Sequence, residues 1–277
     1  EERGLRRMVT ETTTARALAL SVDSYLDRIG YDGPVEPSPE TLAGIVRAHL
    51  LAVPFENLDI IPLGRPIRFE PEALIDKIVR RRRGGFCYEL NGLLGIMLET
   101  IGFRVTRVSA QWPHEDGTLS PVFDHLVLLV EPVDSSDRWL VDVGAGRNSF
   151  GHPVRYVEDE EQAFPGGGRY RFDVAGELRR LSQRDGNDGW QHVYSFTLIP
   201  RRLDDFVGRC VELQTLPDSH FTRGALCSLA RPDGRITLSR DRLIVTVDGA
   251  QDETSLGDDG AMRAALWNHF GIDLARA

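Results

Sequence analysis

The sequence predicts an α+β protein in which helices come first, antiparallel strands follow, and one helix closes the chain. Up to Gly102 the apolar residues recur every three to four positions, as in amphipathic helices. After Gly102 the period changes to two, and from Gly260 to Phe270 it returns to the helical spacing. With 277 residues, of which 41% are hydrophobic, the chain is long enough to bury a proper core.

Three helices are expected before Gly102. Ser38-Pro39 is a start signal, because the hydroxyl caps the first turn and proline fits that turn. A second helix opens at Pro71, and its closing arginines, Arg80 to Arg83, are expected on a solvated face near the negative end of the helix dipole. A third helix opens at Cys87 and ends at Gly102. The residues expected to face inward are Leu42, Ile45, Val46, His49 and Leu50, then Leu74, Ile75, Ile78 and Val79, then Leu90, Leu94, Leu98 and Ile101.

Short strands follow, separated by clusters of Gly, Pro and Asp. They are expected at residues 103–110, 125–130, 138–143, 169–174, 190–198 and 243–247. Such short, closely spaced strands predict an antiparallel sheet or barrel in the middle of the chain. The last helix should turn Met262, Ala265, Leu266 and Phe270 inward.

Composition favours an enzyme that acts on small molecules. The net charge of -9, from 33 basic and 42 acidic residues, argues against a nucleic-acid partner. Three cysteines without a Cys-x-x-Cys pair disfavour a disulfide scaffold and a zinc site, so a reducing cytoplasm and no metal are expected. No apolar run approaches the roughly 18 residues of a membrane span, and Glu1 to Thr14 lacks a signal-peptide core. The residues before Met8 are expected to be a processed or added extension.

A glycine-rich turn leads into the third helix and places Cys87 at its first position. The first amides of a helix lack internal partners and carry the positive end of its dipole, so the pKa of Cys87 is expected to be low. Gly84 and Gly85 are expected to let a substrate approach and to allow unusual backbone angles. Cys210 and Cys227 lack such a setting and are expected to be buried structural residues.

A cysteine nucleophile needs a base and a group that orients the base. His125 opens an apolar strand, and Asp142 lies in the next apolar run, where an unpaired charge would be costly. Strands joined by the short loop 131–137 should be antiparallel neighbours, which would bring His125 toward Asp142. His49 is expected to be a packed core residue instead. Taken singly, Cys87, His125 and Asp142 also fit plain structural roles, and the prediction rests on their combination.

Four ordered motifs resemble those of the arylamine N-acetyltransferase family, and together they cover most of the chain. The family's Arg-Gly-Gly-aromatic-Cys signature matches residues 83–87, and its Pro-Phe-Glu-Asn motif matches residues 53–59. Residues 25–31 are similar to its N-terminal helix, and residues 216–221 to its Pro-x-Ser-x-Phe region. The resemblance implies that Cys87 is the nucleophile, His125 the base and Asp142 the orienting acid.

The resemblance also implies a three-part fold. A helical bundle (1–103) with the nucleophile and a β-barrel (104–210) with the histidine and aspartate would form a cysteine-protease-like core, and residues 211–277 an interdomain segment and an α/β lid. The implied reaction is ping-pong. Cys87 would take the acetyl group of acetyl-CoA, and an arylamine or arylhydrazine would remove it, with the amide of Cys87 as an oxyanion donor.

Further residues receive roles from the same resemblance. A salt bridge between Glu56 and Arg83 would tie the Phe55 loop to the turn that carries Cys87. Phe55 and Phe221 would line the acceptor pocket, although a plain core role for each stays open. Gly144 and Gly146 would lie near the acyl donor.

Two departures from the family pattern bear on specificity. Ala145 stands between the two glycines where the family usually has an aromatic residue, so a larger pocket is expected. Asp124 precedes His125 where the family commonly has a small hydroxyl, so a more acidic pocket and a raised pKa of His125 are expected.

Three other functions remain open at this point. The opening at Ala145 is compatible with an amide synthase of the same family that releases a polyketide chain as a macrolactam. The Cys-His-Asp order also serves cysteine hydrolases and transglutaminase-like enzymes, and a non-enzymatic binding domain could keep a relic of the site. The acceptor amine, the acyl-donor preference and the oligomeric state are not predicted.

Overall fold

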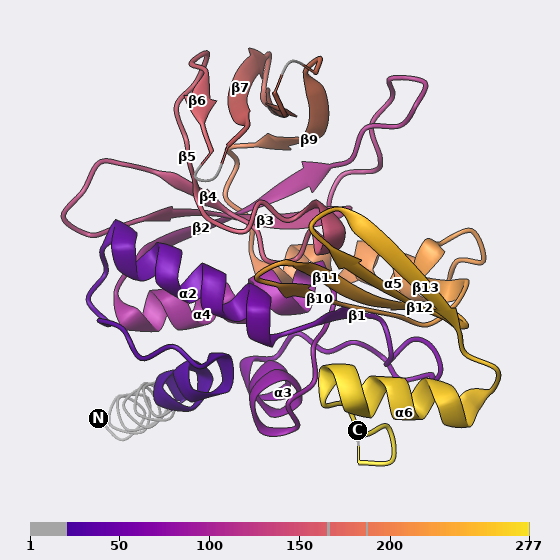
Figure 1. Cartoon of the computed structure of the whole chain (residues 1–277). Coiled ribbons are helices and arrows are strands. Elements are labelled where there is room, and N and C mark those ends of the chain that lie inside the picture. The colour runs from indigo at the N-terminus through magenta and orange to yellow at the C-terminus, as the bar shows by residue number, and fades with distance from the viewer. Residues whose placement is uncertain (1–20, 165–166, 187, 277) are drawn as a thin grey trace.

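The computed structural model describes residues 21–164, 167–186 and 188–276, so the segment before Met8 lies outside the described residues. The predicted mixture of helices and antiparallel strands is confirmed. Helices α2 (Pro39–Ala52) and α4 (Cys87–Ile101) lie beneath one sheet, and α6 (Asp259–Phe270) lies beneath a second (Figure 1). None of the helices in this part of the chain is long and apolar enough to cross a membrane.

Most of the predicted helix ends are confirmed. The hydroxyl of Ser38 caps α2 by accepting the amide of Thr41 at 3.1 Å, and α4 ends at Gly102, which is left-handed with φ 117°. The second predicted helix is divided into α3 (Pro71–Leu74) and a π-helix (Ile75–Arg80). Residues 21–29 form a further helix.

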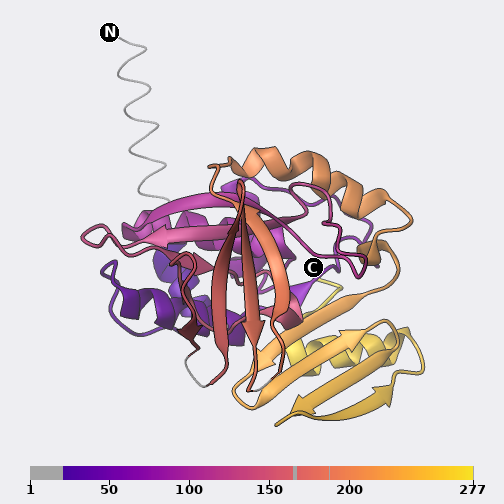
Figure 2. The same cartoon turned by 90° about the horizontal axis from the view of Figure 1, so that it is seen from above.

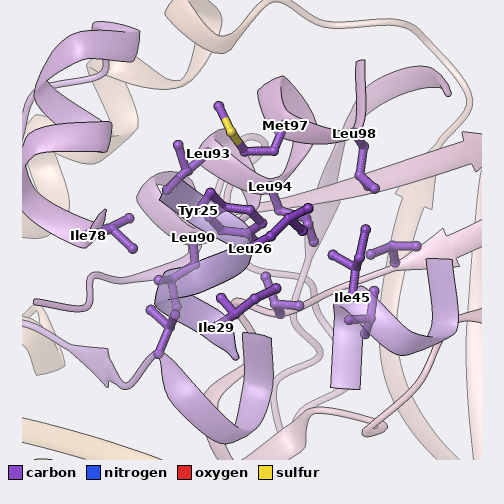
Figure 3. Packing of buried hydrophobic residues seen from close by; sticks show 14 of the residues in the cluster. Tyr25, Leu26, Ile29, Ile45, Ile78, Leu90, Leu93, Leu94, Met97 and Leu98 are labelled. Atoms are coloured by element: carbon purple, nitrogen blue, oxygen red, sulfur yellow. The ribbon is translucent and has the colours of Figure 1, made fainter. Parts of the chain in front are cut away.

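These helices share one apolar core, which fixes α4 and therefore the cysteine at its start. Figure 3 shows side chains from the helix at 21–29, from α2 and from α4 interleaved, with Ile78 of the π-helix beside them. His49 is fully buried, and its Nδ1 lies 2.7 Å from the hydroxyl of Tyr25, so its predicted role as a packed core residue is confirmed. Burying a large aliphatic side chain contributes roughly 1.5–3 kcal/mol.

An antiparallel sheet follows with the strand order β5-β4-β3-β2-β9-β8-β7-β6. The strands β6, β7 and β9 turn upward from β2, β3 and β4, so the sheet is curled (Figure 1). As expected, β3 and β4 are antiparallel neighbours, with Leu128 opposite Val141. The bounds are β2 (Arg104–Gln111), β3 (His125–Glu131), β4 (Trp139–Val141), β5 (Val154–Arg155), β6 (Gln162–Ala163), β7 (Arg169–Ala175), β8 (Leu178–Arg184) and β9 (Gln191–Thr197).

A second antiparallel sheet pairs a strand from the helical region with the strands at 226–255, in the order β1-β10-β11-β12-β13. Its first strand, β1 (Phe55–Glu56), comes from the helical region and pairs with β10, and Phe55 also forms a bridge to Gly85. Helix α6 packs its buried residues Ala265, Leu266 and Phe270 into the core of this region. The other bounds are β10 (Leu226–Arg231), β11 (Gly234–Ser239), β12 (Arg242–Val247) and β13 (Ala250–Ser255).

Helix α5 (Val207–Thr215) links the two sheets and spans the boundary expected at residue 210. Figure 2 shows it set apart from the sheet that contains β10 to β13. Single 3-10 turns lie at Gly146–Asn148, Leu203–Phe206 and His220–Thr222.

Candidate active site

The glycines before Cys87 are required by close packing, against backbone at Gly84 and against a side chain at Gly85. A Cβ added to Gly84 would lie 1.9 Å from the carbonyl oxygen of Pro54, and one added to Gly85 would lie 2.7 Å from a carboxylate oxygen of Glu89. Neither glycine is among the residues of the described chain that have a positive φ. The expectation of unusual backbone angles here is therefore wrong, and the glycines let two chain segments touch.

A buried cluster of five charged side chains supports the same turn. The expected pair is present, with Nε of Arg83 donating to Oε1 of Glu56 at 2.9 Å, and Nη2 of Arg83 also donates to Asp59 at 3.2 Å. Lys77 lies 2.7 Å from both Asp59 and Glu89. Arg83 is only 1% exposed, so the expectation of a solvated face is wrong for this arginine. Two cations therefore face three carboxylates in the interior.

Glu89 connects this ionic cluster to the start of α4. Its Oε2 accepts the amide of Phe86 at 3.2 Å, while its Oε1 accepts Lys77. Burial raises the pKa of Glu89 to about 7, although the charge of Lys77 acts in the opposite direction. The cluster thus fixes the first turn of α4, from which Cys87 projects.

His125 and Asp142 meet across neighbouring strand ends. Nε2 of His125 lies 2.7 Å from Oδ2 of Asp142, and both side chains are buried. Asp142 was expected inside a strand but lies directly after β4, where its Oδ1 accepts the amide of Gly144 at 2.9 Å. Burial acts to raise the pKa of Asp142, but the charge and hydrogen bond of His125, with bonds from Asn91 and Gly144, outweigh burial and lower it. Asp142 is therefore an ionised partner for the imidazole.

Asn91 positions the His125–Asp142 pair, and the sequence patterns did not predict a role for it. It lies one turn after Cys87 on α4. Its Nδ2 donates to Oδ1 of Asp142 at 2.9 Å and to the carbonyl of Leu126 at 2.7 Å, and its Oδ1 accepts the amide of Val143 at 2.9 Å. The available signal was a polar amide in the middle of an apolar helix, because such a group must find buried partners.

Replacing Asn91 by alanine should slow acyl transfer about tenfold to a hundredfold. The variant loses a hydrogen bond to a buried charge, and such a bond is worth about 1.5–3 kcal/mol. The measurement is single-turnover acetylation at a temperature where circular dichroism shows a folded protein. Asn268→Ala, on the exposed face of α6, is the matched control and should not change the rate. Equal rates for both variants would contradict this role.

Two aromatic rings hold the imidazole of His125. The ring of Trp112 lies 4.8 Å from it and that of Tyr194 lies 5.6 Å from it, measured between centroids. Neither residue was predicted as part of the site, because they come from distant segments that the curled sheet brings together. Their packing restricts the ring to the orientation that Asp142 fixes.

Cys87 and His125 line one cavity of about 620 Å³, a volume suited to small-molecule ligands. The loop after β4 lies directly against α4, since a Cβ added to Gly144 would lie 2.6 Å from Cα of Cys87. Burial raises the pKa of the Cys87 thiol, with a hydrogen bond from the Leu126 amide acting against it and the charge of Asp142 adding to it. The expectation of a low pKa from the helix terminus alone is therefore wrong, and ionisation requires an acceptor for the proton.

The other predicted residues are placed around the same cavity. Phe55, Ala145 and Phe221 line it, and the rings of Phe55 and Phe221 lie 6.2 Å apart. Gly144 and Gly146 also line it, and Gly146 packs against the ring of Phe55. Within the described ranges, no group of three or more His, Cys, Asp or Glu side chains could hold a metal ion.

Asp124 lines the cavity but is paired. Its Oδ1 accepts Nε of Arg209 at 2.8 Å and lies 2.7 Å from Nη2 of the same arginine. The guanidinium on α5 therefore offsets much of the charge by which Asp124 was expected to make the pocket more acidic.

Comparisons with known proteins agree on one family. The sequence profile of the N-acetyltransferase family matches residues 39–277. The arylamine N-acetyltransferase of Mycolicibacterium smegmatis is 39% identical over 264 residues, which cover 93% of this chain and 94% of that protein. The structure of Mycobacterium marinum arylamine N-acetyltransferase in complex with CoA has a TM-score of 0.81 at 35% identity and covers 92% of this chain and 93% of that one. The Salmonella typhimurium enzyme has a TM-score of 0.83 at 31% identity, with 91% of each chain covered.

Proposed function

This chain belongs to the arylamine N-acetyltransferase family of acyltransferases, and from that premise we propose that it moves the acetyl group of acetyl-CoA to an arylamine or arylhydrazine. The observation that carries the proposal is the buried His125–Asp142 pair, 2.7 Å between Nε2 and Oδ2, beside the cavity that Cys87 lines. The CoA complex of the Mycobacterium marinum relative supports CoA as the carrier of the acyl group.

The proposed reaction is ping-pong and proceeds through a thioester on Cys87. His125 takes the thiol proton, and the ionised Asp142 stabilises the imidazolium that forms. Because burial opposes a free thiolate, the ion pair with the imidazolium is what makes sulfur nucleophilic. The thiolate then attacks the acetyl carbonyl, and the amide of Cys87 donates to the oxyanion. The coenzyme leaves as a thiol that takes its proton from the His125 imidazolium, which returns His125 to the neutral form. In the second half, His125 takes a proton from the attacking amine, and Cys87 is released.

The remaining residues receive places in the same proposal. Phe55, Ala145 and Phe221 would contact the acceptor, and Gly144 and Gly146 would lie beside the acyl donor. The helical bundle (1–103) and the barrel (104–210) would form the cysteine-protease-like core, with residues 211–277 as interdomain segment and lid. Cys87, Cys210 and Cys227 are free thiols, which suits a reducing cytoplasm.

Intact mass spectrometry tests the proposal. Incubation with acetyl-CoA should add one acetyl group to the protein, and peptide mapping should place it on Cys87. Addition of an arylamine such as 4-aminobenzoate should remove the acetyl group and yield the acetylated amine. A protein that takes no acetyl group and turns over no arylamine would contradict it, and acetyl loss to water that amines do not accelerate would indicate a hydrolase.

One observation favours a second function, an amide synthase that releases a polyketide chain as a macrolactam. Ala145 lines the cavity of about 620 Å³ at the place where an aromatic residue is usual in the family. Single-turnover rates with acetyl-CoA and with a bulky acyl thioester separate the two functions. A rate with the bulky thioester that exceeds the rate with acetyl-CoA would favour the synthase.

A further inference from the structure

An ion pair outside the Cys-His-Asp set lies directly beside it. Arg209 of α5 donates from Nε to Oδ1 of Asp124 at 2.8 Å, and its Nη2 lies 2.7 Å from the same oxygen. The side chains are only 13% and 17% exposed for Asp124 and Arg209. Asp124 precedes His125 in the chain and lines the same cavity as Cys87. A carboxylate in this place can therefore act on both reacting groups.

The segment that contains Asp124 is held from three elements. Tyr88 of α4 donates its hydroxyl proton to the carbonyls of Phe123 at 2.7 Å and Asp124 at 3.2 Å. Ser109 of β2 accepts the amide of Phe123 at 2.7 Å, and Phe123 itself is left-handed with φ 66°. Arg209 of α5 makes the third contact. It is the only one of these three contacts that is an ion pair.

We propose that Arg209 is a positioning residue for the acyl transfer, because its pairing with Asp124 fixes the residue before His125 and cancels a charge that would oppose the Cys87 thiolate. The inference rests on the proposed function. Asp124 and Cys87 are close enough for their charges to interact, and after burial, Asp142 and Cys210 the carboxylate of Asp124 also acts to raise the pKa of Cys87. An unpaired Asp124 would oppose ionisation of the thiol more strongly than the paired one does.

Other titratable or charged groups surround this region and are kept constant in the test. They are Cys87 and Tyr88 on α4, Asp142 after β4, Tyr194 on β9, Arg201 over the ring of Phe123, Cys210 and Glu212 on α5, and His114, His125, Arg147 and His220 along the cavity.

The test measures how fast iodoacetamide alkylates Cys87 across a pH series, a reaction that needs no acyl donor. Arg209→Ala should slow alkylation about tenfold at neutral pH, because a higher thiol pKa lowers the fraction of Cys87 that is ionised. The double variant Asp124→Ser with Arg209→Ala should return to within about threefold of the unchanged protein. Glu212→Ala removes the exposed second partner of Arg209 and should change nothing.

Two results would overturn the inference. One is an unchanged pH profile of alkylation in Arg209→Ala. The other is a double variant that is alkylated as slowly as Arg209→Ala, which would mean that Arg209 only holds α5 in place. Thermal melts of each variant check folding, and Arg209→Lys should keep most of the rate if charge is what matters. Acetylation by acetyl-CoA is measured in parallel. If the alkylation rates change as expected but neither the unchanged protein nor any variant is acetylated, only the proposed function is contradicted.

Discussion

Replacing Cys87 by alanine should abolish acyl transfer, with a loss on the order of 10⁴-fold or more. The reason is that removing a covalent nucleophile leaves no alternative path through the thioester. The side chain lies at the first position of α4 and lines the same cavity as His125, which pairs with Asp142. The measurement is product formation from acetyl-CoA and an arylamine, together with the mass of the protein after exposure to acetyl-CoA alone.

Cys210→Ala is the matched control for this prediction. Cys210 is also a buried free thiol and belongs to the same apolar cluster as Cys87. Burial raises its pKa, and its sulfur accepts a hydrogen bond from Gln214. The Cys210→Ala variant should still gain one acetyl group. If the acetyl group persisted in Cys87→Ala and vanished in Cys210→Ala, the nucleophile would be wrongly assigned.

Replacing Arg83 by glutamine should lower the free energy of unfolding by about 3–5 kcal/mol, as expected when one partner of a buried ion pair is removed. Arg83 is 1% exposed and contacts both Glu56 and Asp59. Without it, Lys77 alone faces the carboxylates of Glu56, Asp59 and Glu89. Urea titration followed by circular dichroism measures the change.

Arg80→Gln is the control from the same run of arginines. Arg80 pairs with Glu72, but the two side chains are 54% and 73% exposed, and exposed pairs contribute only about 0–1 kcal/mol. The free energy of unfolding of this variant should therefore fall by no more than that amount. Equal destabilisation by Arg80→Gln and Arg83→Gln would show that the buried ion pairs of Arg83 contribute no more to stability than an exposed pair.

The sequence predicted the parts of the fold that have strong local signals. Ser38, Pro71 and Gly102 mark helix ends that the structure keeps, because capping and backbone geometry act over a few residues. The apolar runs that became β3 and β4 were also found, since a continuous apolar stretch must be buried. The meeting of His125 and Asp142 followed from the antiparallel pairing of those strands.

Other parts depended on tertiary contacts that have no local signal. Every residue of β13 (Ala250–Ser255) is exposed, so its place in the sheet comes from backbone pairing with β12. The π-helix turns Lys77 inward toward the carboxylates of Asp59 and Glu89, a contact that no local pattern around Lys77 indicates. The pairing of Asp124 with Arg209 joins residues far apart in the chain, and only the folded arrangement reveals it.

The two-residue strand β1 has a consequence for how the protein is made. Its partner strand β10 begins at Leu226, and its other neighbour is Gly85 in the turn before the cysteine. A ribosome synthesises the turn long before it synthesises β10. The nascent chain therefore cannot complete the surroundings of Cys87 until β10 has been synthesised, and a fragment that ends before β10 would lack the cavity wall that Leu226 and Ser228 provide.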